Sequence, residues 1–418
     1  MKLVKILTLS NGLWFGSAQI SILEFLELLH SEPMIDLRMT VCRNGYKKFV
    51  HSLRSFGPVY EVSCYSNMGY PVMAVDEIES LVKEVDLVWI TDVEFLAAPR
   101  VKRIRRDVLV VAHLRSHALI CPWWAALYGF RDVCMEGCSA WRITRCKQGI
   151  NMELTRIGVL SRARANLYYF LDFAKGPVEY ARWRSLMRGV LESIDGFIAV
   201  SRSLWDTHVA HIPELKGKPH AVIYNPVTLP LKYVEPDPNE PYGDYILYAS
   251  GTNPVKGPHI LLDAWSQPER EYPEIKLVMI GCRGSWVEDK ARRLGLKNVV
   301  FLDKMPPTRQ YYNIMYEARA VIMPSIVPEA FGRIPVEANR LRVPAIASNR
   351  GGLVEIVEPG VSGEIWGCCS PNTLAEAIEK VLQRRWSREE IMKHVNAKFD
   401  PNKIRDSIIS FFKVVANA

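Results

Sequence analysis

The amino-acid sequence predicts an α/β protein made of two doubly wound units that face a central cleft. Short apolar segments alternate with segments of helical periodicity in each half of the chain, and a proline-rich stretch at 225–245 separates the halves. Alternating strands and helices are typical of parallel sheets covered by helices on both faces. Such sheets bind ligands beyond the carboxyl ends of their strands, so we expect the functional site between the two units.

Composition and charge are those of an ordinary folded protein. The 418 residues are 49% hydrophobic and 23% charged, which excludes a disordered or fibrous chain. The formal net charge is +8. A basic surface suits nucleotides, phosphates, nucleic acid or anionic lipid, and it equally suits a solvated surface that only keeps the protein soluble.

The first residues, MKLVKILTLSNGL, combine two lysines with a short apolar run. A lysine interrupts this run and no small-residue cleavage site follows it, so a buried first strand explains it better than a signal peptide does. No stretch reaches the roughly 18 apolar residues of a membrane-spanning helix. We therefore expect a cytoplasmic protein, with peripheral association at the cytoplasmic membrane face as a further hypothesis.

The predicted strands fall into two groups. The first half contains strands at 3–9, 86–92, 107–114 and 196–201, and the second half contains strands at 245–251, 276–284, 298–303, 320–325 and 344–349. Gly16 lies in the loop after the first strand, and an amphipathic helix follows. A cysteine-rich loop at 115–150 and Arg- and Tyr-rich helices at 152–192 interrupt the first group.

The stretch 324–357, PSIVPEAFGRIPVEANRLRVPAIASNRGGLVEIV, is the most informative. Glu329 follows a predicted strand and Glu337 lies eight residues later, little more than two helical turns. Phe331 and Gly332 stand where a helix should begin, and a helix N-terminus offers backbone N–H groups to phosphate and sugar oxygens. Two carboxylates there can accept hydrogen bonds from vicinal hydroxyls. On spacing alone, two surface glutamates on one helix are the simpler interpretation.

The wider pattern resembles the signature of the large family of retaining glycosyltransferases with the E-x7-E motif and the GT-B fold. The matching positions are Pro324, Ser325, Glu329, Phe331, Gly332, Glu337, Pro344, Gly351, Gly352 and Glu355. The resemblance covers nearly the whole chain and is strongest over 245–365. It implies a Rossmann-like acceptor-binding domain at 1–228, onto which a helix at 401–418 packs back, and a Rossmann-like donor-binding domain at 229–400.

The resemblance also assigns donor-binding residues outside this stretch. Gly251 and Lys256 match the donor-phosphate segment, in which Lys256 would contact the diphosphate. The arginine that many members carry after this glycine is missing here, and Arg333 is the candidate substitute. Gly281 matches the glycine loop beside the nucleotide base, and Gly16 matches the glycine that approaches the donor phosphate. Phe331, Gly332 and Glu337 complete the expected donor site.

His113, at the end of the strand at 107–114, resembles the family histidine that hydrogen-bonds the transferred sugar. With Glu329 it forms the expected catalytic pair, although His117 competes for the role. The resemblance implies front-face attack without a metal, in which the leaving phosphate takes the acceptor proton. The expected partners are a UDP-, GDP- or ADP-hexose donor and a glycan or lipid-linked acceptor, and no cofactor is required for transfer.

The cysteines leave alternatives open. An odd count of nine in a long chain makes a disulfide framework unlikely. Cys121, Cys134, Cys138 and Cys146 lie close together in the cysteine-rich loop. Four thiolates can hold a structural zinc ion, but the paired Cys-x-x-Cys spacing is missing. Structural zinc, disulfides and buried free thiols stand as equal alternatives.

Residues 155–188 combine several arginines and a lysine with the aromatic residues Tyr168, Tyr169, Phe170 and Trp183. Cationic and aromatic residues on helices suit an anionic membrane surface, and a solvated helix face with a core-facing aromatic stripe is the alternative. A non-catalytic GT-B protein that binds a membrane or nucleic acid is the competing functional hypothesis. No nucleic-acid-binding motif supports binding to nucleic acid, and we expect no nucleic-acid partner.

Overall fold

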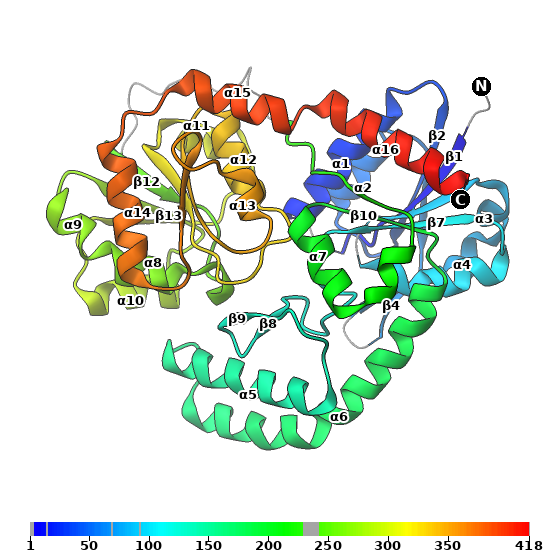
Figure 1. Cartoon of the computed structure of the whole chain (residues 1–418), viewed down its shortest axis with the longest axis horizontal. Helices are drawn as coiled ribbons and strands as arrows, with labels where there is room; N and C mark the ends of the chain where they lie inside the picture. Colours follow the sequence, from blue (N-terminus) through cyan, green and yellow to red (C-terminus); the bar gives the residue numbers. More distant parts are fainter. Residues whose placement is uncertain (1–3, 14–15, 68–69, 92, 229–241, 418) are drawn as a thin grey trace.

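The protein, represented by a computed structural model, contains two parallel β-sheets with helices on their faces (Figure 1). The structure describes residues 4–13, 16–67, 70–91, 93–228 and 242–417, without the side chains of 169–170 and 172–174. The predicted α/β class with two doubly wound domains and the GT-B arrangement is confirmed. Most of the proline-rich stretch, at 229–241, lies outside the described residues.

The first sheet has seven parallel strands in the order β11-β10-β7-β6-β1-β2-β3. They are β1 Val4–Leu9, β2 Ile35–Cys42, β3 Val59–Val62, β6 Leu87–Ile90, β7 Leu109–Leu114, β10 Gly196–Ala199 and β11 His220–Val222. Sequence analysis missed β2, β3 and β11. β3 and β11 are the two edge strands, and an edge strand is only partly buried, so it lacks the continuous apolar run of a central parallel strand.

The second sheet has six parallel strands in the order β14-β13-β12-β15-β16-β17. They are β12 Tyr245–Tyr248, β13 Lys276–Ile280, β14 Val299–Leu302, β15 Ala320–Met323, β16 Ala345–Ser348 and β17 Gly363–Trp366. The first five match the predicted segments. β17 was missed because it is a four-residue edge strand that contains a glycine and a glutamate.

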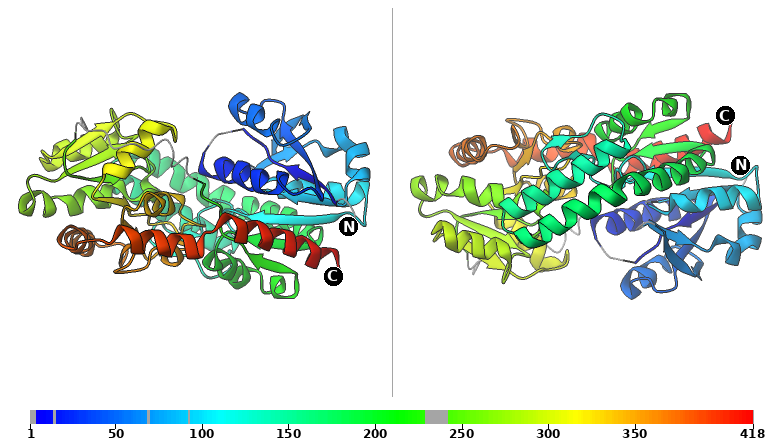
Figure 2. Two further views of the ribbon diagram at one scale, coloured as in Figure 1. Left: turned by 90° about the horizontal axis from the view of Figure 1, so that it is seen from above. Right: turned by 90° about the horizontal axis from the view of Figure 1, so that it is seen from below.

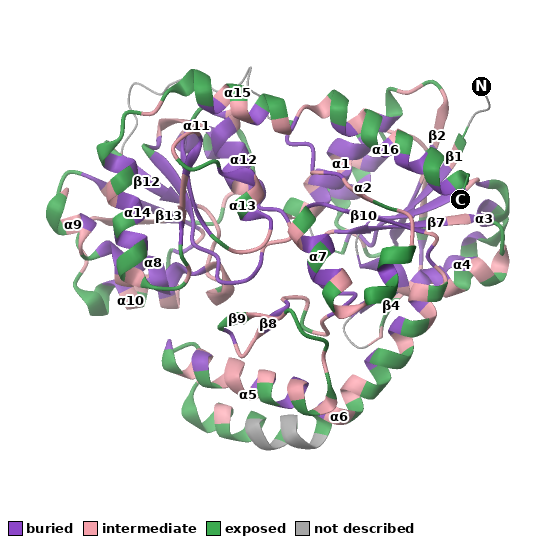
Figure 3. Cartoon of the chain, in the orientation of Figure 1, coloured by how far each residue is buried: buried purple, intermediate pink, exposed green. Residues whose placement is uncertain are grey.

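Helices cover the sheets, and the buried residues follow the strands between them (Figure 3). Around the first sheet lie α1 Ser17–His30, α2 Lys47–Leu53, α3 Glu79–Glu84, α4 Ala98–Ile104, α5 Ala140–Arg156, α6 Arg162–Glu192, α7 Arg202–His211 and the 3-10 turns Val75–Ile78, Glu94–Ala97 and Pro213–Gly217. The second domain carries α8 Pro258–Trp265, α9 Pro268–Glu271, α10 Trp286–Leu294, α11 Arg309–Glu317, α12 Arg333–Arg340, α13 Leu353–Ile356, α14 Pro371–Gln383, α15 Arg388–Lys398 and the turn Pro254–Lys256.

The last helix, α16 Pro401–Ala416, lies against the first domain although it follows the second in sequence (Figure 1). Asp400 caps it by accepting a hydrogen bond from Asn402 N at 2.8 Å. Its apolar face joins the core that contains Phe25 and Trp89, and the rings of Phe412 and Trp89 lie 5.9 Å apart. The helix therefore completes the core of the first domain.

An inserted arm extends from the first domain to the second. It consists of the small hairpin β8 Leu127–Tyr128 and β9 Asp132–Val133 and the helices α5 and α6, which cross beneath both sheets (Figure 2). Leu127 and Phe130 belong to the same apolar core as the buried residues of the second domain. The predicted cysteine-rich loop is shorter than expected, because α5 begins at Ala140 with Ser139 as its N-cap. No helix within the described ranges combines the length and apolarity that crossing a bilayer requires.

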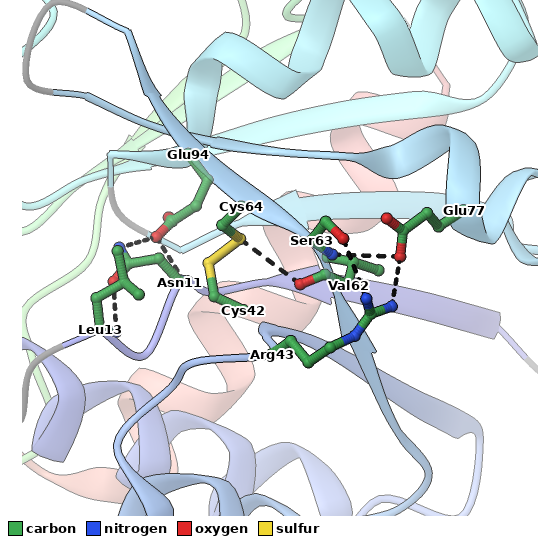
Figure 4. Close-up of a disulfide and its surroundings, with 9 residues drawn as sticks. All are labelled: Asn11, Leu13, Cys42, Arg43, Val62, Ser63, Cys64, Glu77 and Glu94. Carbon is green, nitrogen blue, oxygen red and sulfur yellow. Dashed lines mark hydrogen bonds and ion pairs between the residues drawn. A yellow bond between two sulfur atoms is a disulfide. The ribbon is translucent and has the colours of Figure 1, made fainter.

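Two disulfides correct the expectation that such bonds are unlikely here. Cys42, at the end of β2, is bonded to Cys64, the first residue of the hairpin β4 Cys64–Asn67 and β5 Tyr70–Met73 (Figure 4). The second joins Cys368 and Cys369. Cys42 and Cys64 are 22 positions apart, and only the fold brings their Cα atoms to 5.4 Å.

Candidate functional site

A cleft of about 840 Å³ lies between the carboxyl ends of the two sheets. Most of the predicted catalytic and donor-binding residues line it, namely Gly16, Lys256, Glu329, Phe331, Gly332, Arg333 and Glu337. A second cavity of about 790 Å³ runs along α6 and the turn Pro213–Gly217, and none of the predicted donor-site residues lines it. The cleft is therefore the candidate site.

A lysine–carboxylate pair lies in the cleft. Lys256 Nζ donates to Glu329 Oε1 at 2.6 Å, and Ser325 Oγ donates to the same oxygen at 2.5 Å. The two charged side chains are 28% and 11% exposed, so the pair is partly shielded from water. A cation held this way offers a fixed positive charge to an anion that enters the cleft.

Glycines allow the Glu329 loop to take its position. Gly351 has a φ of +62°, and a Cβ atom there would lie 2.3 Å from the carbonyl oxygen of Glu329. Gly352 N donates to that carbonyl at 2.7 Å. Gly257, with a φ of +72°, would place a Cβ atom 1.9 Å from Pro324 O. The Gly-Gly pair and Gly257 are thus required for close backbone packing around the charged pair.

Helix α12 begins at the cleft, directly after Phe331 and Gly332. Gly332 is the N-cap with a φ of +109°, and a Cβ atom there would collide with the side chain of Leu353. The first backbone N–H groups of α12 therefore lie at the cleft wall. A helix N-terminus of this kind favours a phosphate or another anion.

Arg333 and Glu337 occupy the same wall in a buried ionic network. Arg333 Nε donates to Glu337 Oε1 at 2.6 Å, and the remaining guanidinium nitrogens donate to Glu24 at 2.5 and 2.8 Å. Burial raises the pKa of Glu337 and Arg333 opposes this effect. Burial alone would lower the pKa of Arg333, but Glu24 and Glu337 raise it. Arg333 is therefore a permanent cation directed at two carboxylates, and this geometry does not support its predicted contact with phosphate.

Gly251 and Gly281 lie next to each other, and neither lines the cleft itself. A Cβ atom on Gly281 would lie 3.4 Å from Gly251 Cα, and both residues have positive φ values, +69° and +79°. Tyr248 Oη donates to the carbonyl of Gly251 at 2.8 Å. These contacts hold two strand-end loops together beside Ser250, which lines the cleft.

The structure does not place His113 in the cleft. Its ring is fully buried, 5.1 Å from the ring of Phe25 and 5.7 Å from that of Trp89. Neither ring nitrogen has a hydrogen-bond partner among the described residues. Burial, and then the charge of Arg115, lower its pKa well below the ordinary value. The side chain of His113 points to the α16 side of the sheet, so this arrangement does not support a catalytic role.

His117 is also buried, and its ring stacks 6.0 Å from that of His208. Burial, followed by the charges of His208 and His211, lowers the pKa of His117 to about 3. The side chain is therefore neutral in the folded protein at ordinary pH. His117 does not line the cleft either.

Sequence reasoning missed several residues that line the cleft. Arg115 Nη1 donates to Asn225 Oδ1 at 2.8 Å at the end of the first sheet. Tyr311, on α11, also lines the cleft and donates to Glu337 Oε2 at 3.4 Å. Arg115 directly follows the strand β7, and a polar residue at the carboxyl end of a parallel strand is the signal that could have identified it.

Glu355, from the Gly-Gly-x-x-Glu pattern, joins the two domains outside the cleft. Its carboxylate accepts hydrogen bonds from the backbone N–H groups of Arg202 and Ser203 at 2.9 and 2.8 Å. These groups begin α7, so a carboxylate of the second domain satisfies the N-terminus of a helix in the first. Tyr224 Oη donates to Glu355 at 3.1 Å. The sequence pattern gave no indication of this contact.

The loop cysteines Cys121, Cys134, Cys138 and Cys146 surround one small cavity as free thiols. Gly129 N donates to Cys146 Sγ at 3.4 Å. Burial raises the pKa of Cys138 to about 12 and that of Cys146 to about 11. In the part of the chain that the structure describes, no three His, Cys, Asp or Glu side chains are placed to hold a metal ion. The four cysteines are therefore partly buried free thiols in this structure, and structural zinc stays a prediction that metal analysis would test.

The basic helices are divided between core and surface. Trp183 is buried, and its Nε1 donates to Tyr70 Oη at 3.1 Å. Tyr168 is 41% exposed. The side chains of Tyr169 and Phe170 lie outside the described residues. The aromatic residues of this segment therefore do not share one environment.

Parts of the chain are similar in sequence to known glycosyltransferases. Residues 236–397 match the family model of glycosyl transferases group 1. Over 137 residues, 31% of this chain, it is 31% identical to the D-inositol 3-phosphate glycosyltransferase of Corynebacterium urealyticum. Over 129 residues, 28% of this chain, it is 33% identical to the lipopolysaccharide 1,2-N-acetylglucosaminetransferase of Salmonella typhimurium. These matches span about a third of the two relatives, 32% and 33% of their lengths.

The fold is similar to that of Anabaena HepE in complex with UDP. The TM-score is 0.67 at 20% sequence identity, over 98% of this chain and 100% of the HepE chain. The family model is limited to the second domain, whereas this likeness in fold extends over both sheets.

Proposed function

We propose that this chain is a retaining glycosyltransferase that moves a hexose from a nucleotide-diphosphate sugar to a glycan or lipid-linked acceptor. The observation that carries the proposal is the Lys256–Glu329 pair beside the N-terminus of α12, in a cleft between two Rossmann-like domains. The ammonium group of Lys256 and the helix end offer positive charge to a diphosphate, and Glu337 in the same wall can accept hydrogen bonds from hydroxyls. The match of residues 236–397 to the family model of glycosyl transferases group 1 supports the same class of reaction.

In the proposed reaction the bond between the anomeric carbon and the phosphate oxygen breaks as the acceptor oxygen bonds to the same face of that carbon. The acceptor proton passes to the departing phosphate, so the reaction needs no separate base. Negative charge grows on the diphosphate during this step. Lys256 and the N–H groups of α12 would stabilise that charge where it develops, without a metal ion.

A uridine nucleotide sugar is the first donor to test. HepE is known in complex with UDP and with UDP-glucose, and its fold covers both domains of this chain. GDP and ADP sugars are the alternatives. One relative is a D-inositol 3-phosphate glycosyltransferase and another a lipopolysaccharide glycosyltransferase, which supports acceptors that present sugar or polyol hydroxyls.

The experiment measures nucleotide binding and then transfer. Thermal unfolding is followed with UDP, GDP and ADP and with their glucose and mannose conjugates, because a ligand of the folded state raises its stability. The nucleotide that binds defines the donor, and NMR of the product gives the anomeric configuration. An inverted anomeric configuration in the product would refute the retaining stereochemistry but not the transferase activity. No stabilisation by any nucleotide would refute the donor site and favour a non-catalytic membrane- or nucleic-acid-binding protein.

We also propose that α6 docks on an anionic membrane surface. Exposed residues at helical spacing form one stripe that combines cations with apolar side chains, namely Arg164, Leu167, Leu171, Lys175, Val178 and Arg182. Leu167 and Val178 are 57% and 58% exposed. Apolar side chains among cations are typical of helices that lie in a lipid interface.

Liposome flotation tests this docking. We expect the protein to float with vesicles that contain phosphatidylglycerol and to stay at the bottom with phosphatidylcholine alone. Leu167→Glu together with Val178→Glu should abolish flotation, whereas Val354→Glu, at an exposed site of the second domain, is the control. If the double variant floats as well as the Val354→Glu control does, the proposed role of α6 is wrong.

A further inference from the structure

Three buried charged residues connect the two domains at the cleft wall. Arg333 and Glu337 belong to α12 of the second domain, and Glu24 belongs to α1 of the first. Their side chains are 6%, 4% and 7% exposed. Buried charges are maintained only when their partners hold them in place, so the geometry of each depends on the others.

The guanidinium group of Arg333 fixes the orientation of this network. Its two terminal nitrogens donate to both oxygens of Glu24, and Nη1 also donates to Ser21 Oγ at 3.2 Å. Its Nε donates to Glu337 Oε1 at 2.6 Å. Because a guanidinium is planar and rigid, the pair of hydrogen bonds to Glu24 determines where Nε of Arg333 points. The position of the Glu337 carboxylate therefore depends on Glu24.

The two oxygens of Glu337 have different partners. Oε1 is held by Arg333, while Oε2 accepts only a long bond of 3.4 Å from Tyr311 Oη among the contacts of the described residues. A carboxylate oxygen can accept more than one hydrogen bond. Oε2, in the wall of the cleft, is thus the atom of Glu337 that can bind a hydroxyl of a ligand.

Glu24 also contacts the segment that connects the domains. Its Oε1 accepts hydrogen bonds from Thr228 N at 2.9 Å and Thr228 Oγ1 at 3.1 Å. Thr228 is the last described residue before the stretch at 229–241. One carboxylate therefore contacts α1, the start of the connection and the donor-site wall together, and its bonds to Arg333 require the two domains to lie in this relative position.

We infer that Glu24 is a positioning residue of the donor site, which holds Glu337 through Arg333 so that nucleotide affinity depends on this contact between the two domains. This inference rests on the proposed function, because it assumes that a nucleoside diphosphate binds in the cleft. Glu24 itself does not need to touch the nucleotide. Its effect on affinity must therefore pass through Arg333 and Glu337.

A double-mutant cycle measures that dependence. Binding of UDP, and of GDP and ADP if UDP does not bind, is measured by calorimetry for the wild type, Glu24→Gln, Glu337→Gln and the double variant. We expect Glu24→Gln to raise Kd about tenfold in the wild-type background and less than about twofold in the Glu337→Gln background, as for coupled residues. Glu27→Gln, an exposed residue of α1, is the matched control and should leave Kd unchanged.

The outcomes separate the two proposals. If wild type and Glu27→Gln bind none of the nucleotides, the proposed function fails and this inference with it. If they bind and Glu24→Gln binds equally well, or changes Kd by the same factor in both backgrounds, the positioning role alone is wrong. Should Glu24→Gln not fold, Glu24→Asp keeps the charge but is too short for the fork on Arg333, and we expect it to raise Kd several-fold with the same dependence on Glu337.

Discussion

Replacing Lys256 by methionine tests the charge that the cleft offers to a diphosphate. The substitution removes the ammonium group 2.6 Å from Glu329 and keeps an unbranched apolar side chain. A hydrogen bond to a charged group contributes about 1.5–3 kcal/mol, which corresponds to about 10- to 150-fold in Kd. The side chains of Lys256 and Glu329 are 28% and 11% exposed, and water screens charges that it reaches. We therefore expect the Kd of the variant to rise by the lower part of this range. Glu329 would also lose its counter-charge and repel the phosphate.

Calorimetric titration with UDP measures the effect, and added salt should weaken wild-type binding more than binding to the variant because the lost interaction is between charges. Lys290→Met is the matched control, since Lys290 pairs with Asp263 at 2.7 Å and does not line the cleft. We expect it to change Kd less than about twofold. A folded Lys256→Met variant that binds UDP within about twofold of the wild type would refute the assignment of Lys256 to the diphosphate.

Three further predictions concern stability. Replacing both Cys42 and Cys64 by alanine should lower the free energy of unfolding by about 3 kcal/mol, as expected for a disulfide that closes a loop of this length, and urea unfolding of the two proteins without reductant checks this. An unchanged midpoint would mean that the bond does not form. Burial lowers the pKa of His208 to about 4, so between about pH 6.5 and 4 the unfolded chain binds a proton that the folded chain does not. Stability should therefore fall by up to about 3 kcal/mol as the pH drops through that window, and His208→Gln should reduce the slope in unfolding measurements at several pH values. Phe411→Ala should cost about 3–5 kcal/mol, because this side chain anchors α16 in the first core, and a loss below about 1 kcal/mol in urea unfolding would show that α16 is not part of that core.

Local chemistry was sufficient to predict the central strands. β12 and β15 are buried on both sheet faces, so each appears in the sequence as a continuous apolar run, and β1 and β7 are mostly apolar and buried in the same way. The edge strands could not be found in the same way, because one side of an edge strand has no neighbour and its residues need not be apolar. The start of α5 within the cysteine-rich loop was missed for a related reason. Its residues are mostly polar, and its position depends on packing against α6.

The sequence by itself determined the donor half of the candidate site. Lys256, Glu329, Gly332 and Glu337 lie in one cleft because they follow the carboxyl ends of neighbouring strands, and that proximity is a property of parallel sheets. The family resemblance also pointed to the glycines of the motif, and the structure adds the reason, because a Cβ atom at Gly351 would collide with the backbone of Glu329.

Only the tertiary structure decided what depends on contacts between distant segments. The sequence of β7 does not show on which side of the sheet each of its side chains lies. It therefore could not show that His113 points into the core beneath α16. Glu24 and Arg333 are 309 positions apart, and no local pattern joins them. Ion pairs of this kind form when folding places two charges together in a region that excludes water, so their partners are set by the packing of the two domains and not by the order of residues in the chain.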